Sequence, residues 1–438
     1  MRRLALSLSI ALLAALGVPA AASAASAAPA PATVPFNKAV AAPTGGIEAM
    51  SCLSAKSCIG IGDYASPVKG VSAFLRTWNG ADWGPIYGAV PASSADTLSS
   101  ISCTSAKFCV AVGDRATGVN IETGNEVYAP AVAMWNGSAW TKIAPPAPAS
   151  SAHFSELLAV SCANARSCVA VGQYNVQATD PEVLGGVLLE GFIDVWNGAK
   201  WAASYKTTAG KKGFQATELG GVSCRSATNC VTVGSTYEPI FTTDELMDTT
   251  DRPVALTWNG KKWAASAVPT PSSQPGVLDG VSCWSVSRCV AVGNYFEHPK
   301  GSPVVGKITL MAERWNGAKW SVTNLPTSGF GIWLSDVSCV SASNCLAIGV
   351  NGANGDHYRS LADAWNGKTW RAIAVATPNG GAGSTEGYPN SFELASLTCA
   401  TTKDCVAFGF AGPLGGGIGQ KPFAELYAGS RLSNIADA

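Results

Sequence analysis

The chain has 438 residues with 29 basic and 29 acidic side chains, and only 13% of its residues are charged. Hydrophobic residues make up 47%, which is enough for a large core and excludes a disordered chain. Neither the total charge nor any local run supplies the basic face that non-specific nucleic-acid binding requires, so nucleic acid is excluded as a partner.

The first residues have the pattern of a secretory signal peptide. Arg2 and Arg3 precede an apolar run at 4–18, and small residues follow, with possible cleavage after Ala24 or Ala27. This run is too short to cross a ~30 Å hydrocarbon core as a helix, and no later apolar stretch reaches about 18 residues. We therefore expect residues 1–27 to be a signal peptide, and the protein to be secreted without a membrane span.

An Ala/Pro-rich segment follows at 28–45. Residues 25–33 fit a disordered linker, whereas FNKAVAAP at 36–43 resembles later strand sequences such as WAASAVP at 263–269. We expect a possible strand at 36–43.

A cysteine motif then recurs seven times, as in SCWSVSRCVAVGNY from Ser282. Each copy has two cysteines with five residues between them, and an apolar run that ends in glycine. This is not a usual zinc spacing, and exported thiols oxidise, so we interpret each pair as a disulfide within its repeat. The pairs are Cys52 with Cys58, Cys103 with Cys109, Cys162 with Cys168, Cys224 with Cys230, Cys283 with Cys289, Cys339 with Cys345, and Cys399 with Cys405.

A second motif, Trp-Asn-Gly-x-x-Trp, accompanies the first six cysteine pairs, as in WNGKKW at 258–263. Asn-Gly favours a hairpin turn, and the two tryptophans can pack across the strand pair. The seventh position reads YAGSRL at 427–432 and lacks both tryptophans, so the last repeat is degenerate.

Each repeat accommodates four short strands, here named A to D. Strand A ends at the first cysteine, strand B is the Cys-Val-Ala-Val-Gly run, and strands C and D flank the Asn-Gly turn. Valine-rich strands without helical periodicity indicate an all-β chain. Seven repeats of four antiparallel strands predict a seven-bladed β-propeller over 46–438, with one disulfide in each blade and blades that start near 47, 98, 157, 219, 278, 334 and 394.

These residues resemble the kelch or galactose-oxidase-like propeller repeat. The shared features are the glycine after strand B, an aromatic residue at the end of strand C, a tryptophan that opens strand D and a proline that closes it. The chain differs in having one glycine, Gly293, where kelch repeats have two, and in its added cysteine pair. It is most similar to exported bacterial propellers with Ser-Cys-x5-Cys-Val-Ala-Val-Gly repeats. The resemblance implies a scaffold and no particular activity.

The last blade needs a fourth strand, because strand D is weak after 427–432. Two segments could supply it: residues 36–43, which we favour, and residues 431–435. An uncovered edge would invite aggregation, so we expect one of them to close the ring.

Antiparallel order places the A–B and C–D turns on one face and the B–C and D–A loops on the other. The second face holds nearly all the length variation, so we expect binding there. Exposed rings in those loops could stack on sugars or fill a partner's pocket. The aromatic candidates are Trp333, Phe330, Phe241, Phe296 and Tyr358.

Sequence motifs for chemistry are weak. The three histidines lie in separate repeats without ligand spacing, and neither Gly-x-Ser-x-Gly nor His-Glu-x-x-His occurs. We expect no catalytic residues, no metal and no cofactor. A weak calcium candidate, whose spacing does not match a calcium-binding loop, comprises Asp244, Glu245, Asp248 and Asp251.

The sequence therefore favours an exported, non-catalytic and monomeric binding module. Its ligand would be a carbohydrate, a peptide or an extracellular protein. Two alternatives stay open: a propeller glycosidase or lyase, and a structural protein for cell-envelope adhesion. A carboxylate with a strongly shifted pKa in a cleft on the variable face would favour the enzyme.

Overall fold

The computed structural model describes most of the chain from residue 47 onward. The described residues are 47–66, 70–80, 83–84, 87–88, 96–120, 126–149, 152–177, 187–207, 216–237, 239–241, 246–249, 251–271, 274–297, 307–326, 328–329, 332–352, 358–376, 392–411, 421–427 and 429–437.

Seven antiparallel sheets follow one another along the chain, and each is one blade. Blade one comprises β1 (Ile47–Ser54), β2 (Ser57–Ser66), β3 (Gly70–Trp78) and β4 (Tyr87–Gly88). Blade two comprises β5 (Asp96–Ser105), β6 (Phe108–Val119), β7 (Glu126–Trp135) and β8 (Trp140–Ile143). Blade three comprises β9 (Ser155–Asn164), β10 (Ser167–Gln177), β11 (Val187–Trp196) and β12 (Trp201–Lys206). Blade four comprises β13 (Ala216–Ser226), β14 (Asn229–Tyr237), β17 (Arg252–Trp258) and β18 (Trp263–Ser266).

The remaining three blades have the same order. Blade five comprises β19 (Gly276–Ser285), β20 (Arg288–Glu297), β21 (Lys307–Trp315) and β22 (Trp320–Thr323). Blade six comprises β24 (Ile332–Ser341), β25 (Asn344–Asn351), β26 (Arg359–Trp365) and β27 (Trp370–Ala372). Blade seven comprises β29 (Phe392–Cys399), β30 (Cys405–Ala411), β31 (Lys421–Tyr427) and β32 (Arg431–Asp437). Short additions are β15 (Pro239–Phe241) with β16 (Leu246–Thr249), β23 (Ser328–Gly329) beside β21, and β28 (Ala374–Val375) parallel to β32.

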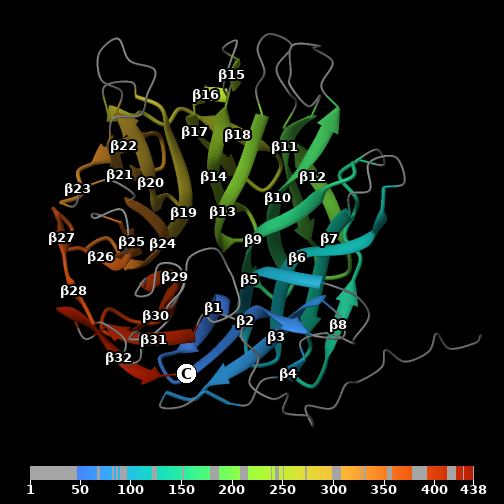
Figure 1. The fold of residues 1–438 in the computed structure, drawn as a ribbon, viewed down its shortest axis with the longest axis horizontal. Coiled ribbons are helices and arrows are strands. Elements are labelled where there is room, and N and C mark those ends of the chain that lie inside the picture. Colours follow the sequence, from blue (N-terminus) through green and yellow to red (C-terminus); the bar gives the residue numbers. More distant parts are fainter. Residues whose placement is uncertain are drawn as a thin grey trace, which may run out of the picture. The chain divides into compact units, whose positions relative to one another are not determined.

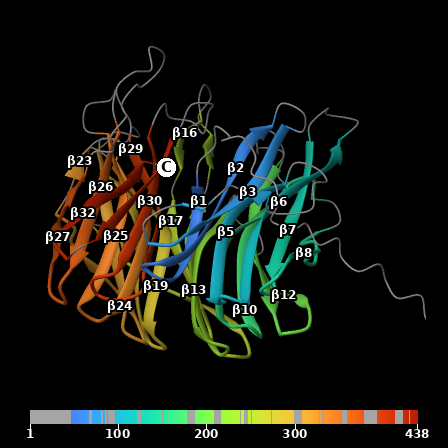
Figure 2. The ribbon, with the colours of Figure 1, turned by 90° about the horizontal axis from the view of Figure 1, so that it is seen from below.

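The blades form a closed ring. Each innermost strand contacts the innermost strands of both neighbouring blades, and β1 contacts β29 where the first and last blades meet. Figure 1 shows β1 and the strands of blade seven side by side, and Figure 2 shows strands of successive blades running between the two faces. Apolar cores fill the spaces between adjacent sheets, as between blades five and six. The predicted seven-bladed propeller is confirmed.

The glycine that ends strand B is required by a bulge in strand A. Register shifts by one residue in strand A of every blade, for example between Leu278 and Gly280. The bulge brings the strand A carbonyl against strand B, so a Cβ on Gly293 would lie 2.1 Å from the Val277 oxygen. Five other blades show the same close approach, at Gly113, Gly172, Gly234, Gly349 and Gly409. Only glycine fits there.

All seven predicted disulfides are present, and each joins strands A and B of its own blade. Their Cα atoms lie 3.9 to 4.1 Å apart, and all fourteen cysteines are paired. Seven disulfides indicate an oxidising, extracellular environment. Within the described ranges, no helix is long and apolar enough to cross a membrane. The observed bonds are Cys52 with Cys58, Cys103 with Cys109, Cys162 with Cys168, Cys224 with Cys230, Cys283 with Cys289, Cys339 with Cys345, and Cys399 with Cys405.

The disulfide cysteines are part of the apolar core. The strand B member of every pair is buried, with exposed fractions of 0 to 5%. These members also belong to the apolar clusters between sheets in all seven blades, because strand B directs them towards a neighbouring sheet. Their role is therefore structural. The buried members are Cys58, Cys109, Cys168, Cys230, Cys289, Cys345 and Cys405.

The serine before the first cysteine joins neighbouring blades. Its hydroxyl accepts a hydrogen bond from the cysteine N–H of the next blade, as from Cys339 to Ser282 at 2.9 Å. Equivalent bonds of 2.9 to 3.0 Å connect every consecutive pair of blades from one to seven. We call these six bonds the hydroxyl belt. The Ser-Cys pair thus satisfies an inner-strand donor between sheets as well as forming a disulfide.

The Asn-Gly motif forms the predicted C–D hairpins. Glycine adopts a φ of 84 to 97° in all seven blades, including Gly429 of the degenerate repeat. In six blades the two tryptophans pair across the hairpin, as Trp258 with Trp263. The Trp258 indole N–H also donates to the carbonyl of Ala227 in the A–B turn at 3.1 Å. The A–B and C–D turns therefore lie together on one face, as predicted.

Blade seven takes its fourth strand from the C-terminal segment. β32 pairs antiparallel with β31, so the second of the two segments considered, around residues 431–435, occupies the strand D position. Residues 36–43, which we favoured, lie outside the described residues. The described strands of blade one all lie within residues 47–88, and the four strands of blade seven lie within residues 392–437. No described strand is therefore exchanged between the first and last blades.

Candidate functional site

The strand A bulges line a cavity of about 220 Å³ on the axis of the ring. Residues from all seven blades contribute to its wall, because every innermost strand presents its bulged pair there. Polar wall residues include Glu48, Ser100, Asp279, Ser335, Asp336 and Ser396.

Three carboxyl groups, those of Glu48, Asp279 and Asp336, line this cavity, and sequence reasoning missed them. Four further carboxyl residues interact electrostatically with these or with one another: Glu156, Glu218 and Glu393 on innermost strands, and Asp114 on β6. The signal was available, because several of them occupy the two variable positions of the strand A pattern. The sequence pattern does not mark these positions as functional. The strand A bulge turns them towards the axis.

These carboxyl groups influence one another. Asp279 is accessible from the cavity, but the surrounding blades restrict its hydration, and this desolvation together with the charge of Glu218 raises its pKa to about 7. Burial, with a smaller effect of Asp114 and Glu218, also raises the pKa of Glu156, against the bond from Gln173. Burial and then the charge of Glu393 raise the pKa of Glu48. The axis therefore favours protonated carboxyl groups or a cationic counter-charge.

Asp336 has a structural role in this ring. Its carboxylate accepts the N–H of Leu397 in blade seven at 2.9 Å and the N–H of Val337 at 2.7 Å. Burial raises the pKa of Asp336 to about 7, although these two bonds oppose the shift. Among the described residues, no group of three or more His, Cys, Asp or Glu side chains is placed to hold a metal ion.

Two of the five aromatic candidates come together at blade six. The rings of Trp333 and Tyr358 lie 5.3 Å apart at an angle of 51°, and both side chains are half-buried. Trp333 lies in β24, where a loop was expected, and a hydrogen bond from its side chain partly offsets the rise that burial causes in the pKa of Glu393. Beside them, the Arg359 guanidinium lies 5.3 Å from the Phe392 ring centroid.

The other three aromatic candidates do not join this pair in the described structure. Phe296 lies in β20, also a strand where a loop was expected, and is half-buried. Phe241 ends β15, and its side chain is outside the described part of the chain, as is the whole of Phe330.

The weak calcium candidate stays a prediction. Asp244 and Glu245 lie outside the described residues, and Asp248 is described only as backbone of β16. The backbone oxygen of Asp251 accepts the Gly276 N–H at 2.8 Å.

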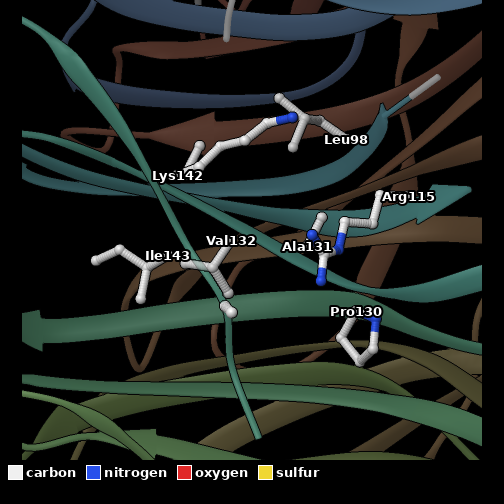
Figure 3. A pocket seen from close by; sticks show the side chains of 9 residues that line it. Leu98, Arg115, Pro130, Ala131, Val132, Lys142 and Ile143 are labelled. Carbon is white, nitrogen blue, oxygen red and sulfur yellow. The ribbon is translucent and has the colours of Figure 1, made fainter. Parts of the chain in front are cut away.

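A separate small hollow of about 40 Å³ lies on one side of blade two. Figure 3 shows Arg115 and Lys142 among its mainly apolar lining of Leu98, Pro130, Val132 and Ile143. Its volume suits one or two water molecules rather than a substrate.

Comparison with known proteins gives no family. No family model matches the chain, and no curated relative matches it. Many solved structures are similar, including the WD40 β-propeller domain of Doa1, at 9% identity, a TM-score of 0.43, and coverage of 87% of this chain and 94% of that one. The propeller domain of the Trilobed protease from Pyrococcus furiosus has 9% identity, a TM-score of 0.46, and coverage of 90% and 98%. The α-L-arabinanase of Penicillium chrysogenum, complexed with arabinobiose, has 9% identity, a TM-score of 0.39, and coverage of 72% and 91%. The chain is thus a β-propeller on the evidence of its own blades, and its resemblance to kelch repeats stays a prediction.

Proposed function

We propose that the protein is an exported, non-catalytic binding module that recognises a carbohydrate, a peptide or an extracellular protein on its B–C and D–A loop face. One observation carries the proposal: Trp333 and Tyr358 form a half-exposed aromatic pair beside Glu393 in a repeat that otherwise places small, aliphatic or acidic residues there. The corresponding residues are Glu156 and Glu218 in blades three and four. An aromatic face beside a carboxylate suits a sugar ring or a peptide side chain.

The proposal is tested by screening the disulfide-intact protein against glycan and peptide arrays, followed by calorimetry on any binder. Trp333→Ala should weaken binding at least tenfold. It should also lower stability by about 1 kcal/mol, because the ring packs on Tyr358. Trp333→Phe, which keeps a ring against Tyr358, separates the two effects.

Trp284→Ala is the matched control, since Trp284 is a half-buried tryptophan near the end of β19, towards the opposite face, where its ring packs against the core between blades five and six. Equal loss of binding in both variants would mean that the screen reports general destabilisation. Full binding by Trp333→Ala would contradict the proposed site.

A glycosidase is the second candidate, and the acidic axis favours it. Burial and then the charge of Glu218 raise the pKa of Asp279 to about 7, so Asp279 is a potential general acid that interacts with a second carboxyl group. Such a pair is what general acid catalysis of glycoside cleavage requires. Release of reducing sugar that disappears in Asp279→Asn would support the enzyme over the binding module.

A further inference from the structure

A second set of carboxyl groups is buried between the blades, away from the axis. Strand C ends with an aromatic residue opposite a cysteine, and the residue two positions earlier is acidic in four blades. The four residues are Asp194, Glu313, Asp363 and Glu425, and we call them the strand C carboxyls. The other three blades have Arg76, Ala133 and Leu256 at this position.

Each strand C carboxyl lies in an apolar environment. Their exposed fractions are 2% for Asp194 and 0% for the other three. Across the sheet Asp363 is flanked by Ala347 and Ala372, and Glu313 by Ala291 and Val322. The strand neighbours Leu361 and Trp365, on the same face as Asp363, pack into a core with Val290 and Ala312 of blade five. The carboxyl groups therefore lie between adjacent sheets.

Most oxygens of the strand C carboxyls lack hydrogen-bond partners. Both carboxyl oxygens of Glu313, Asp363 and Glu425 are buried without a partner, as is Oδ2 of Asp194. A buried carboxylate without a partner is strongly unfavourable, whereas the neutral acid is tolerated far better.

Few charges face the strand C carboxyls from the packed elements. Lys206 on β12 is the cation that acts on this set, because its charge lowers the pKa of Asp194. Arg314 of blade five lies 4.8 Å from the Trp365 ring centroid, and Arg371 on β27 donates to the Gly429 carbonyl in blade seven. Neither contributes to the pKa shifts of Asp363 and Glu425, for which burial is the cause.

We propose that the strand C carboxyls make the propeller a pH-sensitive assembly, which is tightest in acidic surroundings and loosens between blades as they ionise. Burial raises the pKa of Asp194 to about 7, of Asp363 to about 6, and of Glu313 and Glu425 to about 8. In the unfolded chain these groups lose their protons near their ordinary values of 3.8 and 4.5. Their contribution to stability is therefore complete below about pH 4 and is lost as pH rises towards about 8.

The test compares urea unfolding of the disulfide-intact protein at pH 5 and pH 8.5. The wild type should lose at least roughly tenfold in its folding equilibrium constant at the higher pH. Glu313→Gln and Glu425→Gln should each remove a large part of that loss. Glu313→Leu is a second variant at the same site, because Leu256 shows that a leucine fits the equivalent position in blade four, where it is 2% exposed.

Two controls separate this layer from other acids. Leu256→Glu should steepen the pH dependence by adding a fifth strand C carboxyl, whereas Asp279→Asn in the axial cavity should leave most of it in place. A wild type equally stable at both pH values, or Gln and Leu variants that keep the full loss, would overturn the proposal. A loss removed by Asp279→Asn alone would assign the effect to the axis instead.

Discussion

Blade seven contacts blade six on one side and blade one on the other, and the two interfaces differ in their hydrogen bonds. Towards blade six, the Cys399 N–H donates to Ser338 at 3.0 Å, the Leu397 N–H donates to Asp336, and β28 extends the sheet beside β32. Towards blade one, the ring closes without an exchanged strand among the described residues, and the hydroxyl belt is interrupted. There the Thr398 hydroxyl donates to the Met50 carbonyl at 3.4 Å.

The closing interface has a second hydroxyl contact and apolar packing, and that hydroxyl contact also occurs between blades two and three, where the Val160 N–H donates to Ser100 at 3.1 Å. The Met50 N–H donates to Ser396 at 3.2 Å, and Trp83 packs edge-on against Phe408 at 4.8 Å. The apolar core there combines residues of blade one with Val406, Phe408 and Ala424 of blade seven. The comparison shows that consecutive blades share the serine–cysteine bond of the hydroxyl belt, whereas the closing interface lacks that bond and keeps the second hydroxyl contact and the apolar packing.

The largest expected effect comes from deleting residues 431–437, which form β32. The deletion exposes the edge of β31 and removes Leu432, which is 1% exposed, so we expect a loss of more than about 3 kcal/mol. Urea unfolding measures it, with deletion of residues 33–43 as the comparison. A greater loss from the N-terminal deletion would show that β32 is not the strand that closes the ring.

Phe408→Ala should cost about 3–5 kcal/mol, because it removes a fully buried ring at the closing interface. Phe192→Ala, at a ring 1% exposed between consecutive blades, is its matched control. Hydrogen exchange should rise in β1 and β30 for Phe408→Ala only. Identical exchange patterns in the two variants would mean that closure is no more vulnerable than other interfaces.

Ser282→Ala should lower stability by about 1 kcal/mol, because the Cys339 N–H loses its partner in the hydroxyl belt. Thermal unfolding compares it with Ser287→Ala in the neighbouring turn. If both variants melt with the wild type, the hydroxyl belt adds nothing to the interface.

Thr398→Ser is the smallest change, with an expected gain of about 0.5 kcal/mol or less. It gives the closing interface the serine that the other six blades have at this position. Without the threonine methyl group the hydroxyl is free to turn and accept the Cys52 N–H, as in the hydroxyl belt, and NMR of that amide would report the bond. A destabilised variant would show that the threonine methyl group is needed for packing.

Much of this fold could be predicted because its signals are local. Two cysteines five residues apart, an Asn-Gly turn and short valine-rich strands each specify a hairpin from neighbouring residues alone. The pairing of Cys283 with Cys289 and of Trp258 with Trp263 followed from that spacing and is confirmed. The site was predicted less well. Trp333 and Tyr358 meet as candidate residues, but their packing in and beside a strand was not apparent from the sequence.

The sequence by itself determined seven blades, four strands in each, and seven disulfides, since these depend on a repeat that is written out in the chain. Tertiary structure alone decided which residues face the axis and which lie between blades. A strand A bulge reverses the alternation of side chains, so Asp279 and Glu48 reach the cavity although nothing in their local pattern marks them. Likewise, Glu313 and Glu425 look like surface residues until the neighbouring sheet covers them, because burial between blades is a property of the assembled ring.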